Sequence, residues 1–530
     1  MKSPWLNLAA DCLDRQPPRH TALIWEGRDG RQERYSFADL VGLTDRMANA
    51  LEGLGFAPGD RLLLRLGNVP AFPVAFLGAV KAGVLPIPTG PGLSVQELAF
   101  RATDSEARGI LVAQKLRDLA EAVRERWTGL HSVLTTDADG SLTSLLSGSR
   151  PGRPSRPTRP DDPAFIIYTS GTTGHPKGVL HAQRWAAAND PIARLWQAYR
   201  PGDVVAATGP LSWIYPLGNA FLFAWRHGIT VLLAQGPPPA AAWPELVTRH
   251  GVTNLAGTPT FYRQFMAEAA TIPASLRHAV SCGEPLPPYL VQLFQERAGF
   301  PLLDGIGMSE CMTYCAETVQ DPVRPGSCGK ALPGHPVRVL DPATGAELPP
   351  DTDGVLGLHR QDPGLFLEYW RRPAETAAAF QGDYFLTGDV VRRDQDGYYW
   401  FRGRADDLIP SPAGTVSPFA VESCLLEHPG VRDAGVVAGA EGTVKAFVVP
   451  TPGTAPGAQL AKNLIEYVLS RRPPRDAPAE VEFVSVLPRT PSGKLKRKML
   501  RDLEQHRRHD EVAGRSFPEL LAALFDTGAE

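Results

Sequence analysis

The stretch that decides the fold is Tyr168-Thr-Ser-Gly-Thr-Thr-Gly-His-Pro-Lys-Gly178, which directly follows the apolar run Ala164-Phe-Ile-Ile167. A buried strand that breaks into Ser, Thr and Gly supplies hydroxyls and closely approachable backbone N–H groups, and such groups hold phosphate oxygens. The glycines allow backbone conformations that a Cβ would block, and Lys177 adds a mobile cation. The run therefore predicts a phosphate-binding loop rather than an ordinary Gly/Ser turn.

The same run is not a Walker A loop, in which the lysine stands between a Gly and a Ser or Thr. Here Lys177 follows Pro176 and precedes Gly178. The other Gly-Lys pair, Gly493-Lys494, lacks both the leading Gly and the following Ser or Thr. The sequence therefore disfavours a P-loop NTPase.

The bulk composition is typical of a soluble globular protein with more than one domain. The chain has 530 residues and a formal charge of −3, with 43% hydrophobic and 21% charged residues. This near-neutral balance gives no argument for nucleic acid or an anionic membrane surface as a partner. The most apolar stretch, residues 219–235, is interrupted by Arg226 and His227, so we expect buried core and not a membrane span. No signal-peptide pattern opens the chain, and we expect a cytoplasmic protein.

Six cysteines are spread thinly over this length, which fits reduced thiols better than a disulfide framework. Cys311 and Cys315 lie four residues apart, but no second Cys/His pair completes a zinc site. The sequence therefore predicts free thiols.

Strand and helix patterns alternate along most of the chain. Residues 61–66, 71–82 and 84–87 read as strand, helix and strand, and the same alternation returns at 230–233, 243–250 and 254–256. Such βαβ units imply parallel strands with helices on their faces. We therefore expect an α/β fold, with a large N-terminal domain of mostly parallel sheets flanked by helices over residues 1–404.

After residue 404 the pattern restarts as a small α+β module, which we assign to residues 405–530. It is expected to contain helices at 419–427 and 459–469 and strands at 434–437, 444–449 and 481–484. An amphipathic pattern at 517–525 predicts one more helix near the end of the chain.

Three further motifs carry groups that suit nucleotide chemistry. Ser309 and Glu310 end the run Asp304-Gly-Ile-Gly-Met-Ser-Glu310, and a hard carboxylate suits Mg²⁺, although such a pair alone is more often a helix cap. Asp389 ends Tyr384-Phe-Leu-Thr-Gly-Asp389 and can accept hydrogen bonds from a ribose diol or, alternatively, cap its own turn. Lys494 follows Thr-Pro-Ser-Gly, where it is either a mobile cation or the start of a basic surface helix.

Taken in this order, the motifs resemble those of the adenylate-forming superfamily, which comprises acyl- and aryl-CoA synthetases, adenylation domains of peptide synthetases and firefly-type luciferases. The resemblance extends along almost the whole chain and is closest to the benzoate-CoA ligase-like branch. It implies an AMP-forming acid–thiol ligase that uses ATP, Mg²⁺ and either CoA or the phosphopantetheine of an acyl carrier protein. It also implies a mobile C-terminal domain and a monomer or homodimer.

The resemblance assigns roles to individual residues. Ser309 contacts the α-phosphate, Glu310 binds Mg²⁺, and Lys494 is the catalytic lysine. Asp406 is the hinge about which the small domain swings. The remaining nucleotide contacts fall on the phosphate loop, the adenine site and the ribose site: Thr169, Ser170, Gly171, Thr172, Thr173, Gly174 and Lys177; Gly283, Glu284, Pro285, Asp304, Gly305 and Ile306; Asp389 and Arg404.

The acid pocket is implied by residues 211–219, which resemble the acid-binding segment of benzoate-CoA ligases. No Asp lies in this segment to pair with an α-amino group, which argues against an amino-acid-activating domain. The alternative for the aromatic residues is simple burial in the core. The pocket residues implied are Trp213, Ile214, Tyr215, Gly218, Gly257 and Tyr314.

Two positions depart from the common pattern of the superfamily. Ala413 stands where a Gly lines the thiol tunnel, and Thr415 stands where an Arg approaches a phosphate. Free CoA and a carrier protein therefore both stay open as the thiol acceptor. A luciferase-type oxygenase lacks any sequence signal here, and a binding protein without catalysis is disfavoured because Glu310 and Lys494 are both present.

Overall fold

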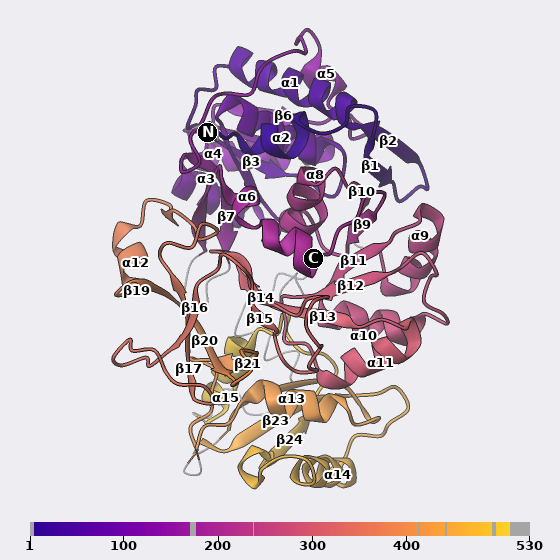
Figure 1. The fold of residues 1–530 in the computed structure, drawn as a ribbon, viewed down its shortest axis with the longest axis vertical. Helices are drawn as coiled ribbons and strands as arrows, with labels where there is room; N and C mark the ends of the chain where they lie inside the picture. Colours follow the sequence, from indigo (N-terminus) through magenta and orange to yellow (C-terminus); the bar gives the residue numbers. More distant parts are fainter. Residues whose placement is uncertain are drawn as a thin grey trace. The chain divides into compact units, whose positions relative to one another are not determined.

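A computed structural model describes residues 5–169, 176–236, 238–411, 414–439, 442–489 and 494–508 (Figure 1). The chain divides into two compact units. The first contains Met1–Leu286, Leu290–Val337 and Leu358–Phe385, and the second contains Pro287–Tyr289, Arg338–Gly357 and Leu386–Glu530.

The largest sheet of the first unit has nine strands in the order β15-β14-β13-β12-β11-β9-β10-β1-β2. The six strands from β13 to β1 run parallel to their neighbours, and antiparallel pairs close both ends. Parallel neighbours require crossover connections, and Figure 1 shows α9, α10 and α11 beside strands β11 to β13. The bounds are β1 Thr21–Glu26, β2 Gln32–Ser36, β9 Val204–Ala207, β10 Thr230–Ala234, β11 Asn254–Gly257, β12 His278–Ser281, β13 Leu302–Met308, β14 Met312–Ala316, β15 Lys330–Ala331, α9 Trp243–His250, α10 Pro259–Glu268 and α11 Pro288–Ala298.

A second sheet, β4-β3-β5-β6, is parallel throughout. Its crossover helix α2 is buried along its whole length, as expected for a helix that is apolar on every face. The mostly parallel α/β fold predicted for the large domain is confirmed. The elements are α1 Phe37–Gly53, β3 Arg61–Arg65, α2 Ala71–Ala82, β4 Leu85–Pro88, α3 Val95–Ser105, β5 Gly109–Val112, α4 Arg117–Arg126, β6 Ser132–Thr135 and α5 Thr143–Leu146.

Shorter elements complete the first unit. Strands β7 Pro163–Thr169, β8 Lys177–Ala182 and β18 Glu368–Tyr369 form an antiparallel sheet. Residues 219–235 belong to the core, as predicted. They form a π-helical turn, helix α8 and strand β10, and almost all of them are buried. The short helices are α6 Trp185–Ala188, α7 Ile214–Leu217, α8 Phe223–Arg226 and α12 Pro373–Ala378, with π-helical turns at Ala10–Asp14, Ile192–Trp196 and Gly218–Leu222 and 3₁₀ turns at Gln114–Leu116 and Ala240–Ala242.

The second unit contains the C-terminal α+β module. Strand β22 pairs antiparallel with β23, and β23 pairs parallel with β24, which confirms the mixed architecture predicted for this part of the chain. The helix expected at 517–525 lies outside the described residues. The bounds are α13 Pro418–Leu426, β22 Val431–Ala438, β23 Val444–Pro450, α14 Ala458–Leu469, a 3₁₀ turn Pro474–Asp476, β24 Glu480–Phe483 and α15 Arg497–Arg508, preceded along the chain by β16 Val337–Leu340, β17 Asp353–His359, β19 Phe380–Gln381, β20 Tyr384–Arg393 and β21 Tyr399–Arg404.

All six cysteines are buried free thiols, as the sequence predicts. Within the residues that the structure describes, the helices are too short or too polar for any of them to cross a bilayer.

The core of the first unit contains one fully buried cation. Lys81 of α2 has no exposed side-chain surface, and its Nζ lies 2.7 Å from a carboxylate oxygen of Asp14 and 2.7 Å from one of Asp45. Asp45 is buried as well, whereas the Asp14 side chain is 27% exposed. Removing Lys81 therefore leaves uncompensated charge in the interior mainly at Asp45.

We therefore expect Lys81→Met to lower the free energy of unfolding by about 3–5 kcal/mol. Arg117→Met is the matched control, because Arg117 makes an exposed 3.8 Å pair with Glu121 and should cost less than about 1 kcal/mol. Urea unfolding followed by tryptophan fluorescence measures both, since every tryptophan except Trp400 lies in the first unit. Equal stabilities of the two variants would contradict the prediction.

Candidate active site

The predicted phosphate loop connects two antiparallel strands. Thr169, the last residue of β7, lies opposite Lys177, the first residue of β8. Lys177 Nζ lies 2.7 Å from Glu375 Oε2 and 5.1 Å from the centre of the Tyr369 ring. Residues 170–175, which include five of the predicted loop contacts, lie outside the described residues. The structure therefore places the two ends of the loop and not its interior.

Ser309 and Glu310 lie in the tight turn between β13 and β14. Met312, which follows the turn, has φ +75°, a left-handed conformation that non-glycine residues adopt rarely and that recurs at functional sites. A Cβ on Gly307 would lie 2.2 Å from the Met312 carbonyl oxygen. Only glycine at position 307 therefore allows the two strands to approach this closely.

Three hydrogen bonds fix the turn to neighbouring segments of the first unit. His181 Nε2 donates to the Ser309 carbonyl oxygen at 2.9 Å, and the Tyr369 hydroxyl donates to Glu310 Oε1 at 2.9 Å. The backbone N–H of Phe366 donates to the Glu310 carbonyl oxygen at 2.7 Å. Burial lowers the pKa of His181 to about 3, so the ring is neutral and acts as a hydrogen-bond donor. The turn is thus held beside β8, the strand that begins at Lys177.

Sequence reasoning missed His181, Tyr369 and Glu375. Residues two apart on a strand point to the same face, so Lys177 and His181 share a face of β8. That alternation is the signal in the sequence that could have identified His181. The partnership of Tyr369 with Glu310 joins residues 59 positions apart and has no comparable local signal.

The predicted adenine residues gather where three parallel strands end. Gly257 of β11 lies beside Ser281 of β12, and Ser281 lies beside Asp304 of β13. Gly283 follows β12 with φ +94°, a conformation that favours glycine. The Glu284 carboxylate accepts a 2.6 Å hydrogen bond from the Thr260 hydroxyl. The segments 283–285 and 304–306 therefore meet at the carboxyl edge of the sheet, the edge where open α/β folds bind ligands.

Asp304 lies next to a second buried carboxyl group, that of Glu317. The Asp304 backbone N–H donates to Glu317 Oε2 at 3.0 Å, and the Arg324 backbone N–H donates to Glu317 Oε1 at 2.9 Å. Burial raises the pKa of Glu317 to about 7. Burial, with the nearby Glu317 charge, raises the pKa of Asp304 well above its usual range. Glu317 was not a candidate from sequence, and it holds the strand that carries Asp304.

The predicted acid-pocket segment lies close to these strand ends. The Tyr215 hydroxyl donates to the Val280 carbonyl oxygen at 3.2 Å, which ties α7 to β12, and burial raises the pKa of Tyr215 well above its usual range. A Cβ on Gly218 would lie 3.1 Å from Met312 Cε, and one on Gly257 would lie 2.7 Å from the Phe261 ring. The absence of side chains at these two positions therefore allows close packing at this edge.

The other three predicted pocket residues differ in exposure. Trp213 and Ile214 are partly exposed at the start of α7, whereas Tyr314 of β14 has no exposed surface. Because Tyr314 is wholly buried, it would support the residues that line a pocket and would not contact the ligand itself.

The predicted ribose residues lie opposite each other in the second unit. Asp389 of β20 pairs with Arg404 of β21, and Arg404 Nη1 lies 3.1 Å from Asp389 Oδ1 and donates to the Thr387 carbonyl oxygen at 2.7 Å. Gly388 has φ +75°, and a Cβ there would lie 2.8 Å from Arg404 Nη2. Glycine at position 388 is therefore required for this arrangement.

The predicted hinge and catalytic lysine also belong to the second unit. The Asp406 carbonyl oxygen accepts a 3.2 Å hydrogen bond from Arg501 Nη1, and the Asp407 carboxylate contacts Arg497 and Arg501 of α15. Lys494 is exposed just before α15. Residue 413, one of the two departures from the common pattern, lies outside the described residues.

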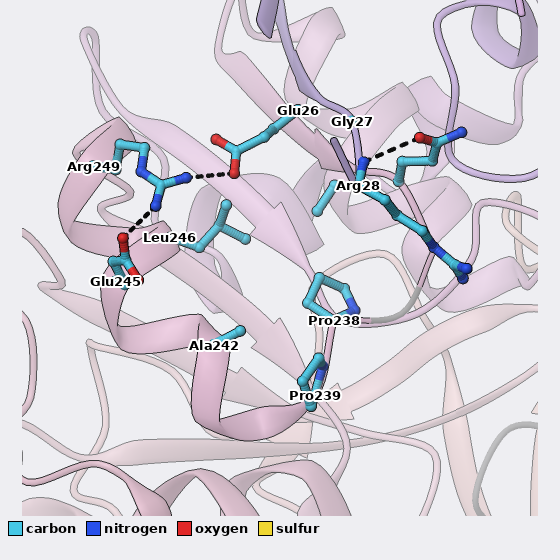
Figure 2. Close-up of a pocket in the computed structure, with 11 residues that line it drawn as sticks. Glu26, Gly27, Arg28, Pro238, Pro239, Ala242, Glu245, Leu246 and Arg249 are labelled. Atoms are coloured by element: carbon cyan, nitrogen blue, oxygen red, sulfur yellow. Dashed lines mark hydrogen bonds and ion pairs between the residues drawn. The ribbon is translucent and has the colours of Figure 1, made fainter. Parts of the chain in front are cut away.

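One open pocket of about 360 Å³ in the first unit contains none of the predicted site residues (Figure 2). Ion pairs join Arg249 to Glu26 and Glu245 along its wall. The charges of Arg249, Glu26 and Glu245 therefore compensate one another within the lining. The predicted motifs lie elsewhere in the chain.

Comparison with known proteins identifies the family. Residues 10–370 match the model of the AMP-binding enzyme family, and residues 420–494 match that of the AMP-binding enzyme C-terminal domain. The chain therefore belongs to the AMP-binding enzymes, the adenylate-forming superfamily, and is a ligase of the acyl-CoA synthetase type.

Three relatives illustrate the similarity. The uncharacterized acyl-CoA ligase YtcI of Bacillus subtilis (strain 168) is 34% identical, over 93% of this chain and 95% of that protein. The human mitochondrial acyl-coenzyme A synthetase ACSM3 is 31% identical, over 94% and 90%. The crystal structure of a benzoate CoA ligase from Burkholderia xenovorans LB400 superimposes with a TM-score of 0.84 at 29% identity, covering 93% of this chain and 99% of that one. These relatives place the chain near the benzoate-CoA ligase-like branch.

The buried Glu317 generates a pH prediction. Its folded pKa of about 7 lies above the ordinary value of 4.5, so the folded state binds the proton more tightly than the unfolded state. The free energy of unfolding should therefore fall as the pH rises from about 4.5 to about 7, by at most about 1.4 kcal/mol per pH unit from this group.

Glu317→Gln should remove the contribution of this group to the pH-dependent decrease in the free energy of unfolding. Glu125→Gln, on the exposed face of α4, should leave that decrease unchanged. Urea unfolding at a series of pH values measures the slope. A Glu317→Gln protein with the wild-type slope would show that Glu317 is not the group that titrates.

Proposed function

We propose that this protein is an ATP-dependent acid–thiol ligase that activates an apolar aryl, alicyclic or medium-chain carboxylic acid as its acyl-adenylate and then transfers the acyl group to CoA. The observation that carries the proposal is the attachment of the Ser309–Glu310 turn to β8 by His181 and Tyr369. This attachment brings a hydroxyl, a carboxylate and the two ends of the predicted loop, Thr169 and Lys177, into one region of the first unit. A phosphate chain needs all three.

In the first half-reaction the acid carboxylate attacks the α-phosphate of ATP, and pyrophosphate leaves. The loop residues Thr169 to Gly174 and Lys177 would hold phosphate oxygens, and Ser309 would donate to the α-phosphate. Segments 283–285 and 304–306 would enclose the adenine. Such a site acts mainly by positioning the reactants and by electrostatic stabilisation.

Glu310 fits the role of the Mg²⁺ ligand. It is 6% exposed, and the Tyr369 hydroxyl fixes one of its oxygens, so its carboxylate is oriented before a ligand arrives. Carboxylate oxygens are the ligands that Mg²⁺ prefers, and the ion, when bound, would neutralise phosphate charge.

In the second unit, Asp389 and Arg404 would bind the ribose hydroxyls and Lys494 would stabilise charge on the α-phosphate. We retain residues 1–404 and 405–530 as the domains that move relative to each other, with Asp406 as the hinge. This boundary differs from the division into compact units, which groups residues 386–404 with the C-terminal module. Contacts flank that position on both sides: Arg404 with Asp389, and Asp407 with Arg497 and Arg501. The Ala405 N–H donates to the Gly388 carbonyl oxygen and the Asp406 carbonyl oxygen accepts from Arg501, so a rotation at residues 405 and 406 would break these two hydrogen bonds.

The acid would lie against α7. No carboxylate lies among residues 211–219 to pair with an amino group, and Trp213, Ile214 and Tyr215 offer apolar surface. The benzoate CoA ligase among the structural neighbours supports an aryl acid, and human ACSM3 supports an acyl substrate.

A second candidate function is the loading of a carrier-protein phosphopantetheine. Ala413 and Thr415, which replace a Gly and an Arg of the common pattern, favour this alternative because they change the region expected to meet the thiol. Thioester formation with CoA against that with a phosphopantetheinylated carrier protein separates the two.

Pyrophosphate release with a panel of acids tests the substrate class. We expect benzoate-like, alicyclic and medium-chain acids to be activated at least about 10-fold faster than any free α-amino acid, because an unpaired ammonium in an apolar pocket is costly. Faster release with an amino acid would overturn the assignment of the pocket.

The lysine assignment is tested with each half-reaction separately. Lys494→Ala should slow adenylate formation about 100-fold or more, the loss expected for one preorganised charge. Thioester formation from supplied acyl-adenylate should change much less, because the phosphate chain is then already cleaved. Lys498→Ala, an exposed lysine of α15, should leave both rates unchanged. Equal losses in both half-reactions for Lys494→Ala would reject the assignment.

A further inference from the structure

A buried cluster outside the proposed nucleotide contacts joins three segments of the first unit. Cys311 directly precedes β14, His335 lies between β15 and β16, and Asp362 lies between β17 and β18. All three are buried, and one ligand atom from each lies within 4.8 Å of the others. Within the described residues, no other group of three Cys, His, Asp or Glu side chains converges in this way.

The separations lie within about 0.4 Å of those between three ligands of a tetrahedral zinc ion. Zn–S bonds of about 2.3 Å and Zn–N and Zn–O bonds of about 2.0–2.1 Å place S and N about 3.6 Å apart and N and O about 3.3 Å apart. Here Cys311 Sγ lies 4.0 Å from His335 Nδ1, and Nδ1 lies 2.9 and 3.1 Å from the two Asp362 oxygens. The Cys311 thiol and the Asp362 carboxylate thus both face His335 Nδ1. A bound ion would replace the hydrogen bonds to this nitrogen with three metal–ligand bonds.

The other side of the imidazole supports the same conclusion. His335 Nε2 and Asn189 Oδ1 are buried, and neither has a hydrogen-bond partner among the described residues. Both border one small space: a Cβ on Gly364 would lie 3.0 Å from His335 Cε1 and 3.2 Å from Asn189 Oδ1. The Asn189 amide is fixed, because its Nδ2 donates to the Trp185 carbonyl oxygen.

The two tautomers of His335 differ in what they present to this space. If Nδ1 carries the proton and donates to Asp362, two acceptors, Nε2 and Asn189 Oδ1, border this space. If Nδ1 binds a metal, Nε2 carries the proton, and the space is bordered by a donor and an acceptor. The metal-bound tautomer therefore avoids placing two buried acceptors at the same space.

We propose that Cys311 Sγ, His335 Nδ1 and the Asp362 carboxylate bind a divalent ion of the zinc class, as a structural site distinct from the proposed Mg²⁺ position. Binding releases the thiol proton to solvent and forms a metal–thiolate bond. Thiolate and carboxylate together carry two negative charges, which a divalent ion balances. The Gly364 N–H, which donates to Asp362 Oδ1 at 2.8 Å, holds the carboxylate in place. Because Cys311 follows Glu310, the ion would fix the turn between β13 and β14 to two further loops.

Co²⁺ is the probe, because thiolate-bound Co²⁺ has a charge-transfer band in the near ultraviolet. The full chain, treated with a chelator and titrated with Co²⁺, should develop this band at about one ion per chain. Cys311→Ser should abolish it, and Asp362→Asn, which keeps the acceptor for Gly364, should weaken Co²⁺ and Zn²⁺ binding by at least about 10-fold. Cys315→Ser is the matched control, since Cys315 is equally buried and lies four residues further on, in β14, and should retain the band.

Circular dichroism establishes that each variant is folded. If Cys311→Ser does not fold, His335→Gln replaces it and should weaken binding while leaving the thiol present. Absence of the band in the folded wild-type chain would overturn the proposal. Unchanged Zn²⁺ content in folded Cys311→Ser or His335→Gln would overturn it as well, because it would show adventitious binding only. The measurement needs neither ATP nor an acid, so its result is independent of the proposed ligase activity.

Discussion

The hydrogen bond from His181 to the Ser309 carbonyl oxygen is the interaction on which the proposed site depends. Hydrogen bonds are stronger in a low-dielectric interior than in water, and His181 is wholly buried and neutral. The bond joins β8, which starts at the end of the proposed phosphate loop, to the turn that ends β13. Tyr369 adds a second bond from the adjacent strand β18 to Glu310. These bonds connect the start of β8 and the Glu310 carboxylate, which belong to separate sheets.

Buried polar groups concentrate around this turn and the neighbouring strand ends. Asp304, Glu317, Cys311, His335 and Asp362 are all at most 5% exposed. Burying such groups is costly unless hydrogen bonds or charges compensate, and here backbone N–H groups and mutual contacts do so. Groups held in this way keep fixed positions. A site that acts by positioning its reactants requires such fixed groups. The same density of donors and acceptors makes this part of the first unit the place where a metal ion could add rigidity.

In the second unit, arginine side chains make the contacts that hold the predicted site segments. Its predicted site residues lie at the strand pair β20–β21 and just before helix α15, and they range from the buried Asp389 to the exposed Lys494. The guanidinium groups of Arg404, Arg497 and Arg501 fix the segments on either side of Asp406 through several donors each. Arginine suits this task because its planar group contacts two acceptors at once. The carbonyl oxygen of Asp406 also accepts a hydrogen bond from Arg501, so the pivot proposed at Asp406 would have to break this contact.

The α/β class, the α+β C-terminal module and most local elements can be predicted from the sequence, because they follow from periodicity and from glycine, proline and capping signals. Helices α2 and α9 begin and end where the pattern predicts, since Gly83 and Gly251 stop them in left-handed conformations. Tertiary structure alone decided that β7 pairs with β8, that His181 and Tyr369 hold the Ser309–Glu310 turn, and that Glu317 supports Asp304. It also decided that Cys311, His335 and Asp362 converge from positions 24 and 27 residues apart. No local pattern encodes these partnerships, because they depend on how separate loops meet at the edge of a sheet.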